Sequence, residues 1–272
     1  MIKRAVKSAL GSVGLEVRRT HRRQFQDLHA DPPSAAAGKV LEFIGASGIG
    51  KSHLRSRLAH SLPSDWLDSQ SVDWTEIEAE MLPRIPSDCQ DVYSRICRRF
   101  AKTAFKSDLW YRDAEQVMQF LSFQIANIRR HLLLEGGLLK GMVMDEGMIF
   151  ITRHEILKEL NRPGSAVHSI LERRVLVAFS AAPEKVVQNI QKRLLERPRL
   201  PEYRGFSEKE ILDSIQKQQQ ELRSFLTFIE PHLGGLLQVE DPGTSDDSVE
   251  RVMRLVDRIS RSEPVTSEKQ VS

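Results

Sequence analysis

The segment GASGIGKS, at positions 45 to 52, constrains the fold of this chain more than any other part of its sequence. It follows the apolar run 40–44, and the residues after it place Leu54, Leu58 and Leu62 at helical spacing, which predicts a helix from Gly50 to about Ser61. The order of strand, glycine-rich loop and helix is the setting in which the pattern G-x-x-x-x-G-K-[ST] binds phosphate. The sequence therefore predicts an α/β domain with a parallel sheet and a phosphate site at the end of its first strand.

Each residue type in this loop has a chemical reason. Small residues let the backbone wrap around phosphate oxygens with its N–H groups pointing inward, and the following helix adds its partial positive end. Lys51 is expected to reach the β- and γ-phosphates of ATP, and Ser52 to offer its hydroxyl to Mg²⁺. The alternative is a glycine-rich turn with a surface lysine. We assign nucleotide binding to Gly45, Ala46, Ser47, Gly48, Ile49, Gly50, Lys51 and Ser52.

A second motif, MVMDEG at 142–147, is an apolar strand that ends in two acidic residues. In an open parallel sheet, ligands bind at the carboxyl ends of the strands. A carboxylate there can bind Mg²⁺ or take a proton from the attacking group, so we expect Asp145 to hold the metal and Asp145 or Glu146 to assist catalysis. The alternative is an acid pair at a helix N-terminus, where the dipole favours it. Arg153 could face the same cleft or lie on the surface.

A basic segment follows the strand expected at 174–179. The helix expected at 183–196 carries Arg193 near its end and leads into a proline-broken stretch with Arg197 and Arg199. A guanidinium is planar and permanently charged, which suits a phosphoryl transition state, and a mobile segment can close over the reaction. These three arginines are therefore predicted to form a catalytic lid. The alternative is a solvated helix end, where cations favour the dipole.

In the order of these motifs, the sequence resembles the P-loop kinase group that includes nucleoside, deoxynucleoside and nucleoside-monophosphate kinases. The resemblance covers about residues 39–261 and rests on GASGIGKS, GMVMDEG, AAPEKVVQNIQKR with the arginines behind it, and LLQVED before the last helix. It implies a three-layer αβα fold with a helical acceptor-side insertion and a lid. It also implies an ATP- and Mg²⁺-dependent kinase reaction and contact of the nucleotide base with Asp241.

The same resemblance implies that residues after the second strand and in the helical block enclose the acceptor. The candidates are Asp73, as a base, and its neighbour Trp74. An anionic group of the acceptor could be held by one of the arginines of this region, which are Arg95, Arg99, Arg112 and Arg153. The alternative for this region is a solvated face, because basic residues recur there at helical spacing, at Arg95, Arg98, Arg99 and Lys102. No motif names the acceptor, which is expected to be a small molecule or a glycan.

Two other functions use the same motifs. An ATPase that couples hydrolysis to a conformational change would use Glu146 to polarise water, and a non-catalytic protein would only bind the nucleotide. A GTPase is disfavoured because the sequence has no Asn/Thr-Lys-x-Asp motif. Outside the motifs, apolar periodicity predicts a strand at 236–240 and helices at 88–106, 111–135, 166–172, 207–230 and 246–261.

Charge is unevenly distributed along the 272 residues, whose net charge is +3. Residues 1–23 hold seven Lys/Arg against one acid, a net of +6, so the remainder sums to −3. On a helical wheel, residues 2–17 form a basic amphipathic stretch that could lie on an anionic membrane, with a disordered or packed extension as the alternative. We expect a basic arm at 1–30, a linker at 31–38, a kinase-like domain at 39–261 and a disordered tail at 262–272.

Composition excludes other partners. Aromatic residues make up only 6%, and the net positive charge comes from the arm alone, so no nucleic-acid surface is expected. Cys89 and Cys97 belong to no Cys-x-x-Cys pattern, so no structural zinc is expected. No apolar run reaches the ~18 residues needed to span a bilayer. The protein is therefore expected to be cytoplasmic, with peripheral membrane contact through residues 1–23.

Overall fold

The computed structural model describes residues 38–63, 66–70, 72–104, 114–137, 141–145, 147–196, 203, 205–241 and 246–261. The predicted arm, nearly all of the predicted linker and the predicted tail lie outside these residues. So do four residues predicted to act in the site, which are Arg112, Glu146, Arg197 and Arg199.

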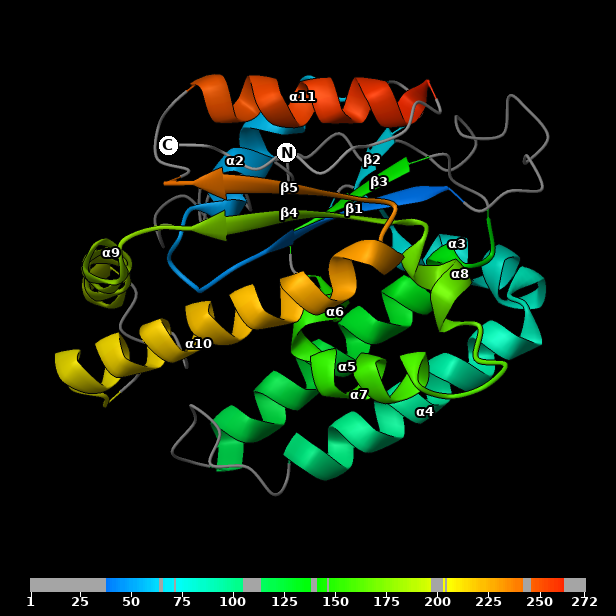
Figure 1. Ribbon diagram of the computed structural model, residues 1–272, viewed down its shortest axis with the longest axis horizontal. Helices are drawn as coiled ribbons and strands as arrows, with labels where there is room; N and C mark the ends of the chain where they lie inside the picture. Colours follow the sequence, from blue (N-terminus) through cyan, green and yellow to red (C-terminus); the bar gives the residue numbers. More distant parts are fainter. Residues whose placement is uncertain are drawn as a thin grey trace, which may run out of the picture.

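The described strands form one parallel sheet with the order β2-β3-β1-β4-β5 (Figure 1). Strand β1 (Lys39–Ile44) lies in the centre, between β3 (Gly141–Met144) and β4 (Arg174–Ser180). Strand β2 (Trp66–Asp68) forms one edge and β5 (Gly235–Glu240) the other. Because every pairing is parallel, all the carboxyl ends meet at one edge of the sheet, where ligands bind in such folds.

Helices cover both faces of this sheet (Figure 1). One face carries α2 (Lys51–Leu58) and α11 (Asp246–Ser260), which pack on each other. The other face carries α4 (Ser87–Ala104), α5 (Ala114–Leu134), α6 (Met148–Ile151), α7 (Arg153–Leu160), α8 (Val167–Leu171) and α10 (Glu208–Ile229). Helix α3 (Trp74–Met81) follows β2, and α9 (Pro183–Glu196) lies beyond the end of β4. The predicted three-layer αβα class is confirmed.

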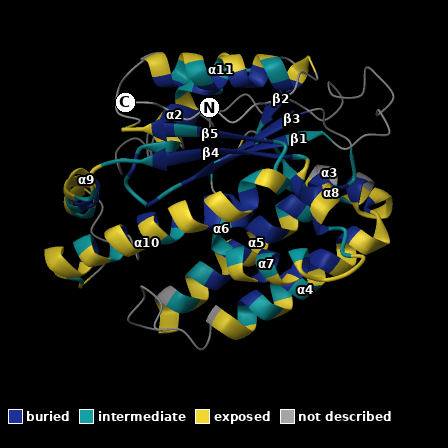
Figure 2. Ribbon diagram, viewed as in Figure 1, coloured by how far each residue is buried: buried dark blue, intermediate teal, exposed yellow. Residues whose placement is uncertain are grey.

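Alternating side chains of the strands feed two separate hydrophobic clusters. Leu41 and Phe43 belong to the cluster beneath α2 and α11, whereas Val40 and Ile44 belong to the cluster against the other helices. The strands are therefore buried on both faces, as Figure 2 shows, which explains why they appear in the sequence as nearly continuous apolar runs. Two charged residues of these strands are buried as well, Glu42 with no exposed surface and Arg174 with 1% exposed.

Most elements expected from the sequence are present at nearly the expected positions, including β1, β3, β4, β5, α4, α5, α8, α9, α10 and α11. The helix expected from Gly50 to about Ser61 ends earlier, at Leu58. The sequence patterns did not indicate β2, α3, α6 or α7. Two short 3₁₀ turns, at Leu82–Arg84 and Glu230–His232, complete the described helical structure.

Candidate phosphate site

The loop between β1 and α2 adopts a conformation that needs its glycines. Gly45, Gly48 and Gly50 have φ values of 147°, 82° and 106°, a region that residues with a side chain rarely enter. Between them, Ala46 and Ile49 are buried in the cluster beneath α2 and α11. The loop is thus anchored by two apolar side chains, and its backbone passes over the carboxyl end of the central strand.

Lys51 begins α2 and turns back onto this loop. Its Nζ donates hydrogen bonds to the carbonyl oxygens of Gly45 and Ala46, at 2.8 and 2.9 Å. The ammonium therefore lies at the loop itself. This placement agrees with the predicted role in binding phosphate, which remains a prediction.

Helix α9 is packed directly against the same loop. Asn189 Nδ2 donates to the carbonyl oxygen of Gly48 at 3.1 Å, and Arg193 Nη1 lies 3.5 Å from Ser47 Oγ. A Cβ on Gly48 would lie 2.8 Å from Ile190 Cγ1, so the helix could not approach this closely over a larger residue. The structure thus brings the predicted lid residue Arg193 to the phosphate loop.

A buried arginine connects the ends of two strands beside the loop. Arg55, on α2, is 6% exposed, and its Nη1 donates to Asp68 Oδ1 at 2.9 Å. Its Nε lies 3.3 Å from Asp145 Oδ2. Asp68 ends β2 and Asp145 follows β3, so both carboxylates lie at the same sheet edge. Sequence analysis missed Asp68 and Arg55, although an acid after the apolar pair Trp66-Leu67 repeats the pattern that identified Asp145.

Asp145 and Ser52 can be tested as a Mg²⁺ site. The Oδ1 atom of Asp145 is buried and has no hydrogen-bond partner among the described residues, while Oδ2 faces Arg55. No group of three His, Cys, Asp or Glu side chains in the described residues could hold a metal by itself. Mg²⁺ is usually held by one or two protein oxygens together with phosphates and water. Asp145 therefore fits a Mg²⁺ ion that is bound jointly with a nucleotide and not by a protein-only cage, whereas the part of Ser52 in such a site remains a prediction.

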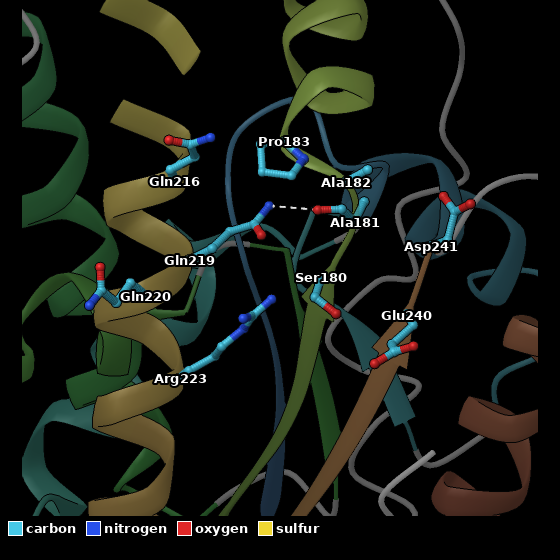
Figure 3. A pocket seen from close by; sticks show the side chains of 10 residues that line it. All are labelled: Ser180, Ala181, Ala182, Pro183, Gln216, Gln219, Gln220, Arg223, Glu240 and Asp241. Atoms are coloured by element: carbon cyan, nitrogen blue, oxygen red, sulfur yellow. Dashed lines mark hydrogen bonds between the residues drawn. The ribbon is translucent and has the colours of Figure 1, made fainter. Parts of the chain in front are cut away.

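A cleft of about 460 Å³ opens at the ends of β4 and β5, against α10 (Figure 3). The polar side chains that line it are those of Gln216, Gln219, Gln220, Arg223, Glu240 and Asp241, and the segment 180–183 completes the lining. Gln219 Nε2 donates to the carbonyl oxygen of Ala181 at 2.9 Å and so fixes α10 to the turn after β4. The cleft therefore lies at the carboxyl edge of the sheet. Strand β4, which lines it, pairs with β1, the strand that leads into the phosphate loop.

Asp241, predicted to contact the nucleotide base, lies at this cleft. Its φ of 45° turns the chain sharply at the end of β5, and its backbone N–H donates to the carbonyl oxygen of Ser180 at 2.7 Å. Its carboxylate pairs with Lys185 of α9. Lys185, Asn189 and Arg193 are four residues apart, so one face of α9 runs from Asp241 to Ser47.

Asp73 and Arg153, two of the predicted acceptor-side residues, both contact neighbouring parts of the fold. Asp73 caps α3, with its Oδ1 accepting the N–H of Thr75 at 3.1 Å. Arg153 pairs with Glu221 of α10 and stacks over the ring of Phe150 at 4.8 Å from its centroid. These contacts do not show whether Asp73 and Arg153 bind an acceptor, so that role remains a prediction. Arg112 lies outside the described residues.

The basic run on α4 divides into two sets. Arg95 and Arg99 both bind the fully buried carboxylate of Glu159 on α7, at 2.8 and 2.9 Å, and so join α4 to α7. Only Arg98 and Lys102 are exposed. The expectation of a solvated face therefore holds for two of the four residues.

The glycine loop after a central parallel strand, with an acid at the end of the next strand, defines a P-loop α/β domain. No family model matches the chain, and no curated protein matches it in sequence. Among solved structures, it is similar to deoxyadenosine kinase from M. mycoides, determined with bound dCTP. The TM-score is 0.42 and the sequence identity 14%, over 80% of this chain and 98% of that one. No helix in the described part of the chain is long and apolar enough to cross a membrane.

Proposed function

We propose that this protein is an ATP- and Mg²⁺-dependent phosphotransferase that acts on a small-molecule or glycan acceptor. The observation that carries the proposal is the convergence of three elements at the carboxyl edge of the sheet. These are the loop after β1, Asp145 after β3 and α9 after β4. Arg193 contacts the loop from one side, and Arg55, on the helix that Lys51 begins, contacts Asp145 on the other. A phosphate bound by this loop would have cations and a carboxylate near it, which supports the proposal because phosphoryl transfer requires them.

The donor nucleotide is proposed to extend from the loop across the ends of β4 and β5. Its phosphates would lie against the backbone N–H groups of the loop and the ammonium of Lys51. Its base would lie at the cleft that includes Asp241, where Gln216 and Gln220 supply amide donors and acceptors of the kind that pair with base edges. Mg²⁺ would neutralise phosphate charge, with Ser52 and Asp145 as its protein ligands.

The acceptor is proposed to approach from the opposite side of the loop. In the order β2-β3-β1-β4-β5, the cleft lies on the β4–β5 side, whereas Asp68 and Asp145 lie on the β2–β3 side. A hydroxyl held near these two carboxylates would face the end of the phosphate chain. The candidates to take its proton are Asp145, Glu146 and Asp73, to which the structure adds Asp68. Arg193, with Arg197 and Arg199, would stabilise the charge of the transferred group.

The test follows γ-labelled ATP with purified protein and Mg²⁺, with and without an extract of small metabolites and glycans. We expect label in a new organic species only when the extract is present, and we expect Lys51→Ala to abolish it. Lys192→Ala, which changes an exposed lysine of α9, serves as the matched control and should keep activity. Equal release of free phosphate with and without extract would instead identify an ATPase. Nucleotide binding without turnover in either sample would identify a binding protein.

A further inference from the structure

Glu42 places a carboxyl group in the middle of the central strand, where burial is complete. Its neighbours on the same face of β1, Val40 and Ile44, both belong to the hydrophobic cluster on the sheet face opposite α2 and α11. Burying a carboxyl group costs free energy unless its oxygens are bound by specific partners. The partners of Glu42 therefore indicate what the residue does.

Those partners belong to the segment that follows Asp145. The Oε2 atom of Glu42 accepts the backbone N–H of Ile149 at 3.3 Å. Its Oε1 lies 3.3 Å from Nδ1 of His131, a fully buried residue of α5. The other ring nitrogen of His131, Nε2, accepts the backbone N–H of Met148 at 3.3 Å. Since Nε2 is an acceptor, the ring proton of His131 is on Nδ1, the nitrogen nearer to Glu42.

The same carboxyl group also fills the space beneath Gly147. A Cβ at this position would lie 2.3 Å from Glu42 Oε2 and 3.0 Å from Glu42 Cβ. The glycine of the DEG motif therefore allows the backbone to rest directly on Glu42. Together, Glu42 and His131 bind the first two N–H groups of α6, which have no partner within the helix itself.

A charged network holds the pair from behind. Arg174, at the start of β4, is 1% exposed, and its Nε lies 3.4 Å from Glu42 Oε1. Its Nη2 donates to the hydroxyl of Tyr93 at 2.8 Å and also pairs with Glu135. Glu42 is thus fixed by groups from α5, β4 and the start of α6. It cannot turn away from the segment after Asp145 without breaking these contacts.

We propose that Glu42 and His131 are positioning residues that fix the acidic turn containing Asp145 relative to the phosphate loop. Strand β1 then fixes the positions of both the phosphate loop and the acidic turn. Its end leads into Gly45, and the side chain of Glu42 supports the turn from Gly147 to Ile149. The consequence for Mg²⁺ and nucleotide rests on the proposed function, whereas the support of the turn does not.

The first test uses NMR to measure the hydrogen exchange rates of the backbone amides of Met148 and Ile149 in the full chain. Glu42→Gln leaves an acceptor for only one neighbour, and His131→Phe removes the acceptor of Met148 in a ring of similar size. Each variant should speed exchange at the affected amide by about tenfold, the effect of losing one hydrogen bond. Glu159→Gln is the matched control, because it changes a fully buried carboxyl on α7 that supports α4. Unchanged exchange, or equal acceleration in the control, would overturn the proposal.

The second test measures ATP affinity with and without Mg²⁺ in the same variants. We expect Glu42→Gln and His131→Phe to lose most of the Mg²⁺-dependent gain in affinity, while Mg²⁺-free affinity changes by less than about twofold. A general loss of folding would instead lower both affinities and would appear in Glu159→Gln as well. If the wild-type protein binds no ATP, the proposed function fails, and the exchange experiment alone decides whether the pair positions the turn.

Discussion

At the scale of single residues, Glu42 couples folding to pH. Burial is the largest cause of its shift and raises its pKa from 4.5 to about 7, while the nearby Arg174 acts in the opposite direction. Between these two values the folded protein holds a proton that the unfolded chain releases. The folded state is therefore favoured by protonation, and the stability that this proton contributes is fully present below about pH 4.5 and lost as the pH rises to about 7.

Glu42→Gln should remove this dependence. We expect the variant to gain stability relative to wild type between pH 5 and pH 7, by at most about 1.4 kcal/mol per pH unit. Urea unfolding at several pH values measures the difference, and the contributions of all other titratable groups cancel to first order in the comparison. A difference that stays constant across this range would show that Glu42 keeps its ordinary pKa.

Gly147 provides a second prediction at this scale. Its φ of −72° is ordinary, so a larger residue is excluded by contact with Glu42 and not by backbone strain. We expect Gly147→Ala to lower the free energy of unfolding by about 1–3 kcal/mol, as overpacking does in cores. Gly164→Ala is the matched comparison, because its φ is positive but nothing lies within 4 Å of the added Cβ. Urea unfolding that shows Gly164→Ala to be the more costly change would contradict the prediction.

At the scale of elements, sequence patterns predicted what is local and missed what depends on distant contacts. The phosphate loop was predicted because its glycines, lysine and serine lie in one short segment between a strand and a helix. Strand β2 was missed because its three residues, Trp66–Asp68, are too few for a period and depend on pairing with β3. Helices α6 and α7 were missed because the pattern breaks at Thr152, whose hydroxyl donates to the carbonyl oxygen of Met148.

The candidate site shows the same division. Lys51, Asp145 and Arg193 were predicted from motifs, and the structure places all three near the carboxyl edge of the sheet. Glu42 was not identified, because one acid within the run KVLEFI gives no sign of the side chain's partners on α5 and α6. Arg55 was not identified either, since its contacts with two strand ends exist only in the assembled sheet.

Arg55 carries a prediction about how α2 is joined to the sheet. Its removal would leave the mostly buried carboxylates of Asp68 and Asp145, whose side chains are 15% and 14% exposed, without their common cation. We expect Arg55→Met to destabilise the protein by about 3 kcal/mol, near the lower end for a broken buried ion pair. Arg98→Met, at an exposed position on α4, should cost less than about 0.5 kcal/mol in the same unfolding experiment. Equal costs would show that the pairing contributes nothing.

Helix α9 carries a prediction about catalysis. Arg193 contacts the phosphate loop, while its neighbour Lys192 is exposed. Under the proposed function, Arg193→Gln should lower kcat by about 10², the usual effect of removing one donor to the transition-state charge. ATP affinity should change much less. Lys192→Gln should match wild type in both quantities, and a pure loss of affinity in Arg193→Gln would assign the residue to nucleotide binding.

At the scale of the whole molecule, the strand order separates the two halves of the proposed reaction. The central strand carries the phosphate loop, with the cleft at the ends of β4 and β5 on one side and Asp68 and Asp145 on the other. Arg55, on the helix that follows the loop, pairs with Asp68 and Asp145 on one side. On the other side, α9 contacts both the loop and Asp241. The proposed donor and acceptor sites can therefore differ in chemistry while they share one phosphate position.

The uneven charge of the chain gives a last prediction, also at this scale. Residues 1–23 carry a net +6 and the remainder −3, so any attraction to an anionic surface should come from the arm alone. Deleting residues 1–30 should abolish sedimentation with anionic vesicles and leave ATP affinity unchanged, because β1 begins only at Lys39. Replacing Lys3, Arg4 and Lys7 with serine keeps the length and should lower vesicle binding about a hundredfold, at about 1 kcal/mol per charge. Neutral vesicles provide the control for apolar insertion, and equal sedimentation of the full and shortened chains would refute membrane contact through the arm.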